Sequence, residues 1–375
     1  MSNISAKSLT LLDIDLGAVA ANIKILKSKI SAKTALAGVV KANAYGLGLE
    51  QIALTHLHAG TRSFFVATLE EGTALRQILD QSEAKDTEIA ILCGLLPGMA
   101  GEYLVHRLTP VLNDLGQVAL CRKDLGGLPA MLHVDTGMRR LGLDAGEAAA
   151  VLADPALLDG IQLAAILSHL ACADEPDHPL NAQQLQLFDR FTAQFSGVRQ
   201  SFSNSSGLFL SPAYHRDLAR PGMAVYGLNP VAPLANPMKP VVRLRARILQ
   251  LRDAAAGESV GYSATYQCTK PRRVATIALG YADGFLRSLS SRGFVFFGEP
   301  GQQQPCPIIG RVSMDLITVD VTDLTGAAPR AGDFVDVFGA GQDVDHLAGV
   351  AGTIGYEILT ALGARHTRHY HGHAV

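Results

Sequence analysis

VVKANAYGLG, residues 39–48, begins as the end of a buried strand and then breaks at a lysine. Lys41 is followed by Asn43, Tyr45 and two glycines, residue types that favour a turn rather than a continued strand. A lysine can close a strand for a structural reason, because its aliphatic stem carries the ammonium to water. The alternative is that Lys41 takes part in a reaction, and the rest of the chain decides between these two interpretations.

The apolar run that ends at Lys41 belongs to a repeating pattern. We identify about eight short apolar runs in the first 230 residues or so, each a candidate strand. They cover residues 35–40, 63–68, 88–93, 108–113, 130–135, 163–169, 199–204 and 217–222. Stretches with helical spacing lie between them, for example at 16–30, 145–158 and 181–195. Continuous apolar strands that alternate with amphipathic helices are typical of a parallel sheet covered on both faces. The pattern therefore predicts an α/β fold, a TIM-like (β/α)8 barrel.

The pattern changes after residues 229–240, where four prolines favour a linker. In VRLRARILQL, residues 242–251, apolar side chains alternate with arginines, as in a half-buried strand. Similar runs follow, and residues 346–362 predict one or two helices. We therefore expect a barrel domain over 1–235 and a mainly β domain over 236–375, leaving open that residues 1–12 pack with the C-terminal domain.

Composition narrows the class of partner. The chain has 375 residues, 48% hydrophobic and 18% charged, which is typical of a globular protein. A net charge of −2 gives no electrostatic signature for nucleic acid or an anionic membrane, so we expect a small-molecule partner. The sequence contains no run of about 18 apolar residues, the length that a membrane span requires. The five scattered cysteines and the lack of a signal-peptide pattern favour a cytoplasmic protein with reduced thiols.

Histidines are frequent at the end of the chain, at positions 366, 369, 371 and 373. Without an acidic or cysteine partner nearby, they favour a frayed, solvated tail over a metal site.

Polar residues gather where the predicted barrel strands end, the edge at which barrels place their reacting groups. The set is Lys41, then Asp135, Thr136, Gly137, Met138 and Arg140, then His169, Asn204, Ser205, Arg220 and Gly222. A lysine together with an arginine, an imidazole and a Ser/Gly-rich anion cradle suggests a phosphorylated aldehyde cofactor held as a Schiff base.

Seven motifs make the pattern recognisable: VVKANAYGLG, HVDTGMRRLG, LSHLACADE, ARPGMAVYG, VGYSATY, LGYADG and GRVSMDLITVD. In this order, over roughly residues 12 to 360, the chain resembles the alanine racemase family. The resemblance implies a pyridoxal 5′-phosphate (PLP) racemase of fold type III, with a barrel followed by a β domain in a head-to-tail homodimer. It also implies that L- and D-alanine are interconverted and that D-alanine is supplied for peptidoglycan.

Racemisation needs two bases, because the α proton leaves from one face and returns to the other. The resemblance assigns Lys41 as the Schiff-base lysine and one base, and Tyr262 of VGYSATY as the second base, delivered by the partner subunit. Tyr266 is the local alternative to Tyr262. Arg140 is implied to favour the phenolate of Tyr262 and to orient the substrate carboxylate.

The remaining site residues are also implied by the resemblance. Arg220 is expected at the pyridine nitrogen, which an arginine leaves unprotonated. His169 is expected against the ring. The other cofactor contacts are expected from Tyr45, Asn204, Ser205, Gly222, Met223 and Tyr356. Met314 and Asp315 match the substrate-carboxylate loop, and Tyr281 and Arg287 match positions near the substrate entrance. No metal site is expected.

Three positions depart from the family pattern. Many members carry a carbamylated lysine where this chain has His133, and an imidazole cannot form that anion. We therefore predict a bound chloride or a nearby carboxylate beside Arg140. Leu47 replaces a histidine of the first motif, and Ser201 stands where some members have a histidine near the pyridine arginine.

Other functions stay open at this point. A broader racemase, acting on serine or another small amino acid, would carry the same motifs. A decarboxylase of the same fold class resembles a different motif set. A PLP-carrier protein would also place a lysine after the first barrel strand, but it would lack the β domain that carries VGYSATY.

Overall fold

The computed structural model describes residues 7–82, 84–232, 234–299, 301–339 and 341–372. The described chain forms two compact units. One unit is Val19–Lys239, and the other combines the described residues up to Ala18 with those from Pro240 onward. The N-terminal strand thus belongs to the same unit as the C-terminal third of the chain.

The unit Val19–Lys239 is built on parallel strands. In the described part of the chain, seven of them form one sheet in the order β3-β4-β5-β6-β7-β8-β9, and β10 pairs in parallel with β2. The strands are β2 (Ala35–Leu36), β3 (Gly38–Val39), β4 (Ser63–Val66), β5 (Glu88–Ile91), β6 (Thr109–Leu112), β7 (Pro129–His133), β8 (Gln162–Leu167), β9 (Arg199–Ser201) and β10 (Leu218–Ala219). The N–H of Asp217 donates to the carbonyl of Gln200 at 3.0 Å, and that of Arg220 to Ser203 at 2.9 Å. These bonds connect β10 to β9, so the TIM-like barrel is confirmed.

The strands near the closure are shorter than the sequence predicts. The run 35–40 is split between β2 and β3, and the runs 199–204 and 217–222 keep only three and two strand residues. Beyond the bond between Arg220 and Ser203, side chains begin to replace a neighbouring strand as hydrogen-bond partners of the backbone. An example is the N–H of Gly222, which donates to the hydroxyl of Ser205. The chain leaves the ladder there to form loops.

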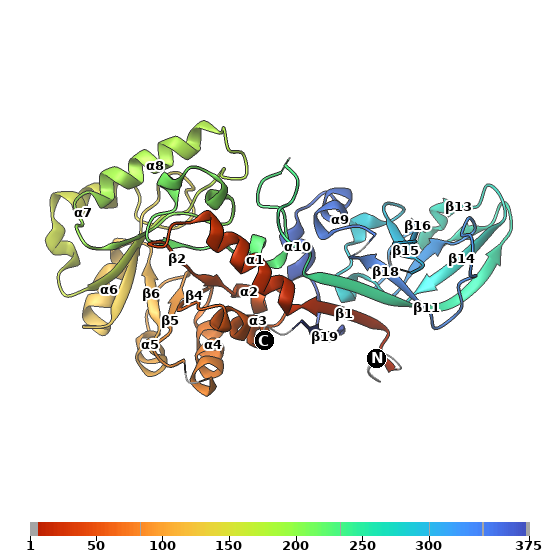
Figure 1. Cartoon of the computed structure of the whole chain (residues 1–375), viewed down its shortest axis with the longest axis horizontal. Helices are drawn as coiled ribbons and strands as arrows, with labels where there is room; N and C mark the ends of the chain where they lie inside the picture. Colours follow the sequence, from red (N-terminus) through yellow and green to blue (C-terminus); the bar gives the residue numbers. More distant parts are fainter. Residues whose placement is uncertain (1–6, 83, 233, 300, 340, 373–375) are drawn as a thin grey trace. The chain divides into compact units, whose positions relative to one another are not determined.

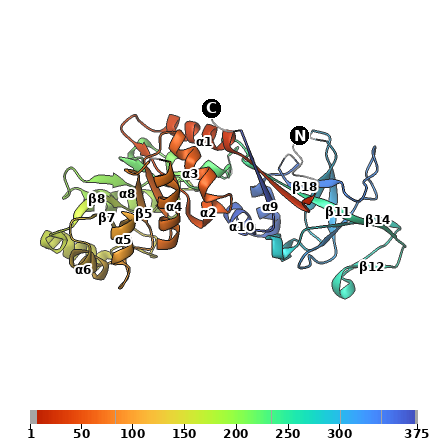
Figure 2. The same cartoon turned by 90° about the horizontal axis from the view of Figure 1, so that it is seen from below.

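Helices lie outside the ring of strands (Figures 1 and 2). They are α1 (Leu16–Lys29), α3 (Leu49–His58), α4 (Leu69–Gln81), α5 (Ala100–His106), α6 (Leu115–Asp124), α7 (Ala145–Ala153) and α8 (Pro179–Thr192). The connections also contain the 3₁₀ helices η2 (Pro155–Leu158), η3 (Ser206–Phe209), η4 (Pro212–Tyr214) and η5 (Met223–Tyr226). Thr68 and Asp144 begin α4 and α7 with capping boxes, which satisfy helix N–H groups that have no partner within the helix. Strands β4 and β6 are buried at every residue, as expected for strands covered on both faces.

The second unit is mainly β, as predicted. In its described residues, β11 pairs with both β14 and β18, and the order β14-β17-β16-β15-β18 closes an antiparallel ring through β11. The elements are β11 (Val242–Ala254), β12 (Ser259–Val260), β13 (Tyr266–Gln267), β14 (Arg272–Ile277), β15 (Phe294–Phe297), β16 (Gln304–Ile309), β17 (Ile317–Asp320) and β18 (Phe334–Phe338), with η6 (Tyr262–Ala264), η7 (Tyr281–Asp283), η8 (Arg287–Leu289), α9 (Val344–Ala351) and α10 (Gly355–Thr360). Along β11, the apolar residues are buried and the arginines are half-buried as far as Ile248, which confirms the predicted alternation.

The histidine-rich end of the chain is ordered within this unit, and our prediction of a frayed tail is wrong for residues 366–371. Strand β19 (Thr367–His371) pairs in parallel with β1 (Thr10–Asp15), which also pairs with β11. His366 is 3% exposed and lies 2.9 Å from the hydroxyl of Thr10. The Nδ1 of His369 lies 3.1 Å from Asp13. Pairing with the N-terminal strand, which is far away in sequence, orders this segment. His373 lies outside the described residues.

Candidate functional site

Lys41 follows β3 and opens a left-handed turn, labelled α2 (Lys41–Tyr45). Ala42, Asn43, Ala44 and Tyr45 have φ angles of 53°, 53°, 52° and 55°. A left-handed conformation costs about 1–2 kcal/mol per non-glycine residue, because Cβ approaches the following carbonyl. The run KANAY therefore does not adopt this turn by local preference. Tertiary contacts hold it.

The amine of Lys41 lies among cations. Burial lowers the pKa of Lys41, and Arg140 and Arg220 lower it further, while Glu71 and Cys93 act in the opposite direction. Desolvation and neighbouring positive charge both favour the neutral amine. A neutral amine is the form that acts as a nucleophile or as a general base.

The loops after β9 and β10 form a small polar cradle. The hydroxyl of Ser205 accepts the N–H of Gly222 at 3.0 Å and that of Ala224 at 3.3 Å. A Cβ on Gly222 would lie 2.2 Å from the hydroxyl oxygen of Tyr45, so this close approach requires glycine. Met223 begins the 3₁₀ helix η5 directly after Gly222. A phosphate fits such a cradle, which combines hydroxyl groups with a helical turn near the late barrel strands.

Asn204 has a bracing position beside this cradle. Its amide donates to the carbonyl of Leu170 at 3.3 Å, and its oxygen accepts the N–H of Gly207 at 2.9 Å. These bonds connect the loop after β9 to the loop after β8.

Arg220 is a buried cation, 5% exposed. Its guanidinium donates to the hydroxyl of Ser201 and, at 2.6 Å, to the carbonyl of Ser168. Burial lowers the pKa of Arg220 to about 10, so the group stays protonated at neutral pH. Among the described residues Arg220 makes no ion pair with a carboxylate, which leaves its charge to interact with a neutral or anionic acceptor.

Two histidines of the barrel mouth are neutral near pH 7. Burial, and then Arg220 and other cations, lower the pKa of His169 to about 3. Burial and Arg220 likewise lower the pKa of His133 to about 4. The backbone carbonyl of His169 accepts a bond from Gln184, whose amide also reaches Thr136, so this edge is braced by hydrogen bonds.

Arg140 is exposed, in the loop that follows β7. Its charge affects the pKa values of Lys41, His169 and His133, which places it among these groups. In the part of the chain that the structure describes, no carboxylate forms an ion pair with Arg140. The carboxylate that we offered as one substitute for the family's carbamate is therefore not found; a bound anion stays a prediction.

Two tyrosines compete for one predicted role in the β unit, and their settings differ. Tyr262 is 70% exposed and lines a groove of about 1060 Å³ together with Arg311 and Leu316. Tyr266 packs against the buried cluster that includes Val260. Only Tyr262 projects away from the core of its own unit.

The other predicted residues of the β unit form neighbouring loops. The N–H of Tyr281 donates to Ser313 at 3.1 Å, and that of Ala282 to the carbonyl of Met314 at 2.9 Å, so the two loops are joined. Met314 is 54% exposed, and its N–H makes no hydrogen bond to any described residue. Asp315 pairs with Arg365 at 2.8 Å. The predicted entrance residue Arg287 begins η8 and is exposed, and the predicted phosphate contact Tyr356 is half-buried in α10.

Sequence reasoning missed Glu71. Its carboxylate accepts the N–H of Ala42 at 2.6 Å and that of Ala67 at 2.8 Å. The signal was present, because Thr68 and Glu71 have the spacing of a capping box directly after a predicted strand. That signature indicates the helix start, however, and not the contact with the lysine turn. Asn113, which bonds His133, had no comparable signal.

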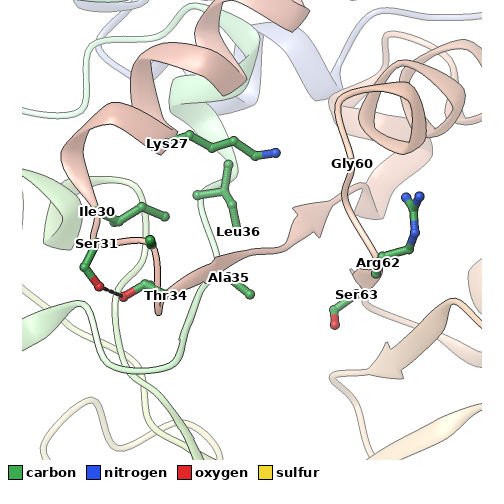
Figure 3. A pocket seen from close by; sticks show the side chains of 10 residues that line it. Lys27, Ile30, Ser31, Thr34, Ala35, Leu36, Gly60, Arg62 and Ser63 are labelled. Carbon is green, nitrogen blue, oxygen red and sulfur yellow. Dashed lines mark hydrogen bonds between the residues drawn. The ribbon is translucent and has the colours of Figure 1, made fainter.

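A second pocket lies at the opposite end of the barrel strands. It measures about 590 Å³ and lies where β2 and β4 begin (Figure 3). Lys27 donates to the carbonyl of Ala59, and Arg62 to that of Leu57 at 3.2 Å. Both cations therefore satisfy the C-terminal end of α3, which explains their presence without a ligand.

Among the described residues, no group of three or more His, Cys, Asp or Glu side chains is arranged to hold a metal ion. No helix there has both the length and the apolar character needed to cross a bilayer.

Comparison with known proteins covers nearly the whole chain. The family models "Alanine racemase, N-terminal domain" and "Alanine racemase, C-terminal domain" match residues 14–230 and 241–370. Alanine racemase of Acidiphilium cryptum (strain JF-5) is 49% identical over 360 residues, covering 95% of this chain and 97% of that protein.

Solved structures are similar over the same extent. The crystal structure of alanine racemase from Bartonella henselae with covalently bound pyridoxal phosphate is 38% identical, with a TM-score of 0.90, covering 97% of this chain and 99% of that one. The biosynthetic alanine racemase from Pseudomonas aeruginosa is 36% identical, with a TM-score of 0.86 and coverage of 97% and 99%. The two domain matches, the identity and the shared fold agree with the motifs read from the sequence, and the chain belongs to the alanine racemase family.

Proposed function

We propose that the protein interconverts L- and D-alanine with pyridoxal 5′-phosphate bound to Lys41. The observation that carries this proposal is the placement of a desolvated lysine amine at the strand edge that also holds the Ser205–Gly222 cradle. The residues fit the cofactor in three places. The amine, whose neutral form burial favours, suits its aldehyde, and the cradle suits its phosphate. Buried Arg220, which forms no ion pair with a described carboxylate, suits a pyridine nitrogen that stays unprotonated.

Lys41 acts in the proposal as the base on one face of the substrate. When bound, PLP supplies an electron sink that eases removal of an amino acid's α proton. Burial and the charge of Arg140 lower the pKa of Lys41, which favours the neutral amine that can accept that proton. His169 would lie against the cofactor ring as a neutral imidazole, because burial lowers its pKa to about 3. The phosphate contacts would come from Tyr45, Ser205, Gly222, Met223 and Tyr356, with Asn204 bracing the loop.

Tyr262 acts as the second base, on the opposite face. Its 70% exposure on its own unit suits a residue that works outside that unit, whereas Tyr266 is held by packing. We propose that Tyr262 is delivered to the Lys41 site of a second copy of the chain, so that the enzyme is a homodimer with shared active sites. A guanidinium near the phenol would favour its ionised form, and Arg140 is the proposed neighbour.

The substrate carboxylate would be held by Arg140 and by the N–H of Met314, with Asp315 beside it. The exposed Met314 loop supports this, because its N–H has no acceptor among the described residues. Tyr281 and Arg287 would line the entrance. Their exposure is compatible with contact to a small polar ligand.

An anion beside Arg140 completes the site. His133 is neutral because burial lowers its pKa to about 4, so it cannot offset the arginine charge. We propose that chloride takes this place, as the smallest common anion that could replace a carbamate.

In the cell, we propose that the enzyme supplies D-alanine for peptidoglycan and works in the cytoplasm. The similar P. aeruginosa protein is described as biosynthetic, and the five cysteines of this chain are unpaired. A broader racemase and a PLP carrier are the alternative functions.

The proposed function is tested by mapping the lysine that carries the cofactor and by measuring the racemisation of amino acids. Borohydride reduction of the purified protein, followed by peptide mass spectrometry, should place one pyridoxyl group on Lys41, and Lys41→Ala should lose both the label and the visible absorbance. Lys123→Ala, at an exposed position of α6, is the matched control. The L- and D-enantiomers of alanine should then interconvert faster than those of serine or lysine.

The outcomes separate the alternatives. A labelled protein without any turnover would support a carrier, and equal turnover of serine and alanine would support a broader racemase. A label on another lysine would overturn the proposal.

A further inference from the structure

The turn that carries Lys41 is unfavourable on its own. Four non-glycine residues in succession have φ angles of 52–55°, a region that such residues rarely adopt. Strain of this kind persists only where surrounding contacts determine the conformation. Some of these contacts are local: the N–H of Gly46 donates to Ala42 at 2.8 Å, and that of Leu49 donates to the side chain of Asn43 at 2.8 Å. None of them uses the N–H of Ala42, the residue that follows Lys41.

That N–H donates to Glu71. The Oε1 of Glu71 accepts it at 2.6 Å, across 29 positions of sequence. The Oε2 accepts the N–H of Ala67 at 2.8 Å and that of Thr68 at 3.4 Å. One carboxylate therefore bonds to the chain just after β3 and just after β4, which are paired neighbours in the barrel.

Glu71 is itself held in place. The hydroxyl of Thr68 accepts the N–H of Glu71 at 3.4 Å, which completes the capping box of α4. A side chain fixed by its own helix can restrain another segment, because little conformational entropy remains to be lost. Glu70 also lies in the first turn of α4, but it is exposed. The hydrogen bonds that lower the pKa of Glu70 come from its own backbone and from the side chain of Thr68.

We propose that Glu71 is a positioning residue for the reaction, holding the left-handed turn so that the amine of Lys41 keeps one direction at the barrel mouth. This rests on the proposed role of Lys41. A glutamine could accept the N–H of Ala42 with its oxygen, but its other end is an N–H₂ group that would face the donors of Ala67 and Thr68. Both carboxylate oxygens are therefore needed.

The charge of Glu71 has a separate effect. It raises the pKa of Lys41 against the lowering by burial and Arg140. Glu71→Gln removes the charge and one acceptor, and Glu71→Ala removes both acceptors. Comparing them with Glu70→Gln separates a role in positioning from a general effect on the start of α4.

The experiment uses the holoenzymes of wild type, Glu71→Gln, Glu71→Ala and Glu70→Gln. We expect kcat to fall on the order of 10- to 100-fold in both Glu71 variants, because the reacting amine is misplaced, with KM for alanine changing far less. Hydrogen–deuterium exchange should become faster in the peptide covering residues 39–48. The pH at which the visible absorbance of the bound cofactor titrates should move in the Glu71 variants. Glu70→Gln should match wild type in all three measurements.

Failure of this inference differs from failure of the proposed function. If wild type carries no cofactor on Lys41, the proposed function fails before the variants are compared. If wild type is labelled on Lys41 but both Glu71 variants keep wild-type kcat and exchange in residues 39–48, the positioning role is overturned. Should Glu71→Ala fold poorly, Glu71→Gln decides alone, since it preserves the side-chain size.

Discussion

The Nδ1 of His133 lies 2.8 Å from the Oδ1 of Asn113. The amide of Asn113 donates to Leu92 at 3.1 Å and to Val111 at 2.9 Å, which leaves its oxygen directed to the imidazole. An oxygen accepts only, so Nδ1 carries the proton and Nε2 keeps a lone pair. His133 is thus held as a neutral imidazole with a defined tautomer at the position where many family members have an anionic side chain.

Because neither His133 nor a described carboxylate offsets Arg140, we expect alanine binding to depend on chloride. Replacing chloride by gluconate at constant ionic strength should raise KM for alanine severalfold. The variant His133→Glu, which supplies a fixed carboxylate, should lose this dependence. Steady-state kinetics in matched salt series measure both effects. An unchanged KM in wild type would contradict the anion site.

Tyr262→Phe should keep the visible absorbance of the cofactor but slow racemisation by about 10²- to 10⁴-fold, the usual contribution of a general acid or base. The loss should be greater in the L-to-D direction, as the two-base proposal requires. Tyr266→Phe is the matched control, since Tyr266 packs in a cluster that a phenylalanine also fills. Initial rates in both directions are measured by chiral chromatography. If only Tyr266→Phe is slow, the second base has been misassigned.

Gly222→Ala should weaken cofactor binding by about ten- to a hundredfold, since a Cβ there would lie 2.2 Å from the Tyr45 hydroxyl and overpacking costs about 1–3 kcal/mol. The control is Gly101→Ala in α5, where an added Cβ meets no atom within 4 Å. Titration of the apoenzymes with PLP, followed by fluorescence or absorbance, gives the two affinities. Equal affinities would argue against a phosphate cradle at this turn.

Acid should destabilise the barrel unit through its buried histidines. Burial lowers the pKa of His56 from 6.5 to about 3, so below pH 6.5 the unfolded chain binds a proton that the native chain does not. Unfolding free energy therefore falls as pH decreases from 6.5 towards 3, by about 2 kcal/mol for this group at pH 5. His133 and His169 act in the same direction.

His56→Gln should flatten the pH dependence of the unfolding free energy between pH 7 and 5, measured by urea denaturation at each pH. His58→Gln, an exposed neighbour on α3, should keep the wild-type slope. A His56 variant with the wild-type slope would show that the neutral imidazole is not the source of the acid sensitivity.

The sequence by itself determined the order of strands and helices, since continuous burial and alternating burial leave different periods in the chain. It predicted β4 and β6 as buried strands and β11 as a half-buried one, and all three are found. It also placed Lys41, Ser205 and Arg220 at one barrel edge, because parallel strands bring their carboxyl ends together.

Only the tertiary structure decided how these residues are held. The left-handed turn after Lys41 opposes local preference and depends on Glu71, 29 positions beyond Ala42. The ordered histidine tail depends on pairing with β1, at the other end of the chain. Tyr262 differs from Tyr266 in exposure, although both lie in one short motif. Such contacts join residues far apart in sequence, and local periodicity carries no record of them.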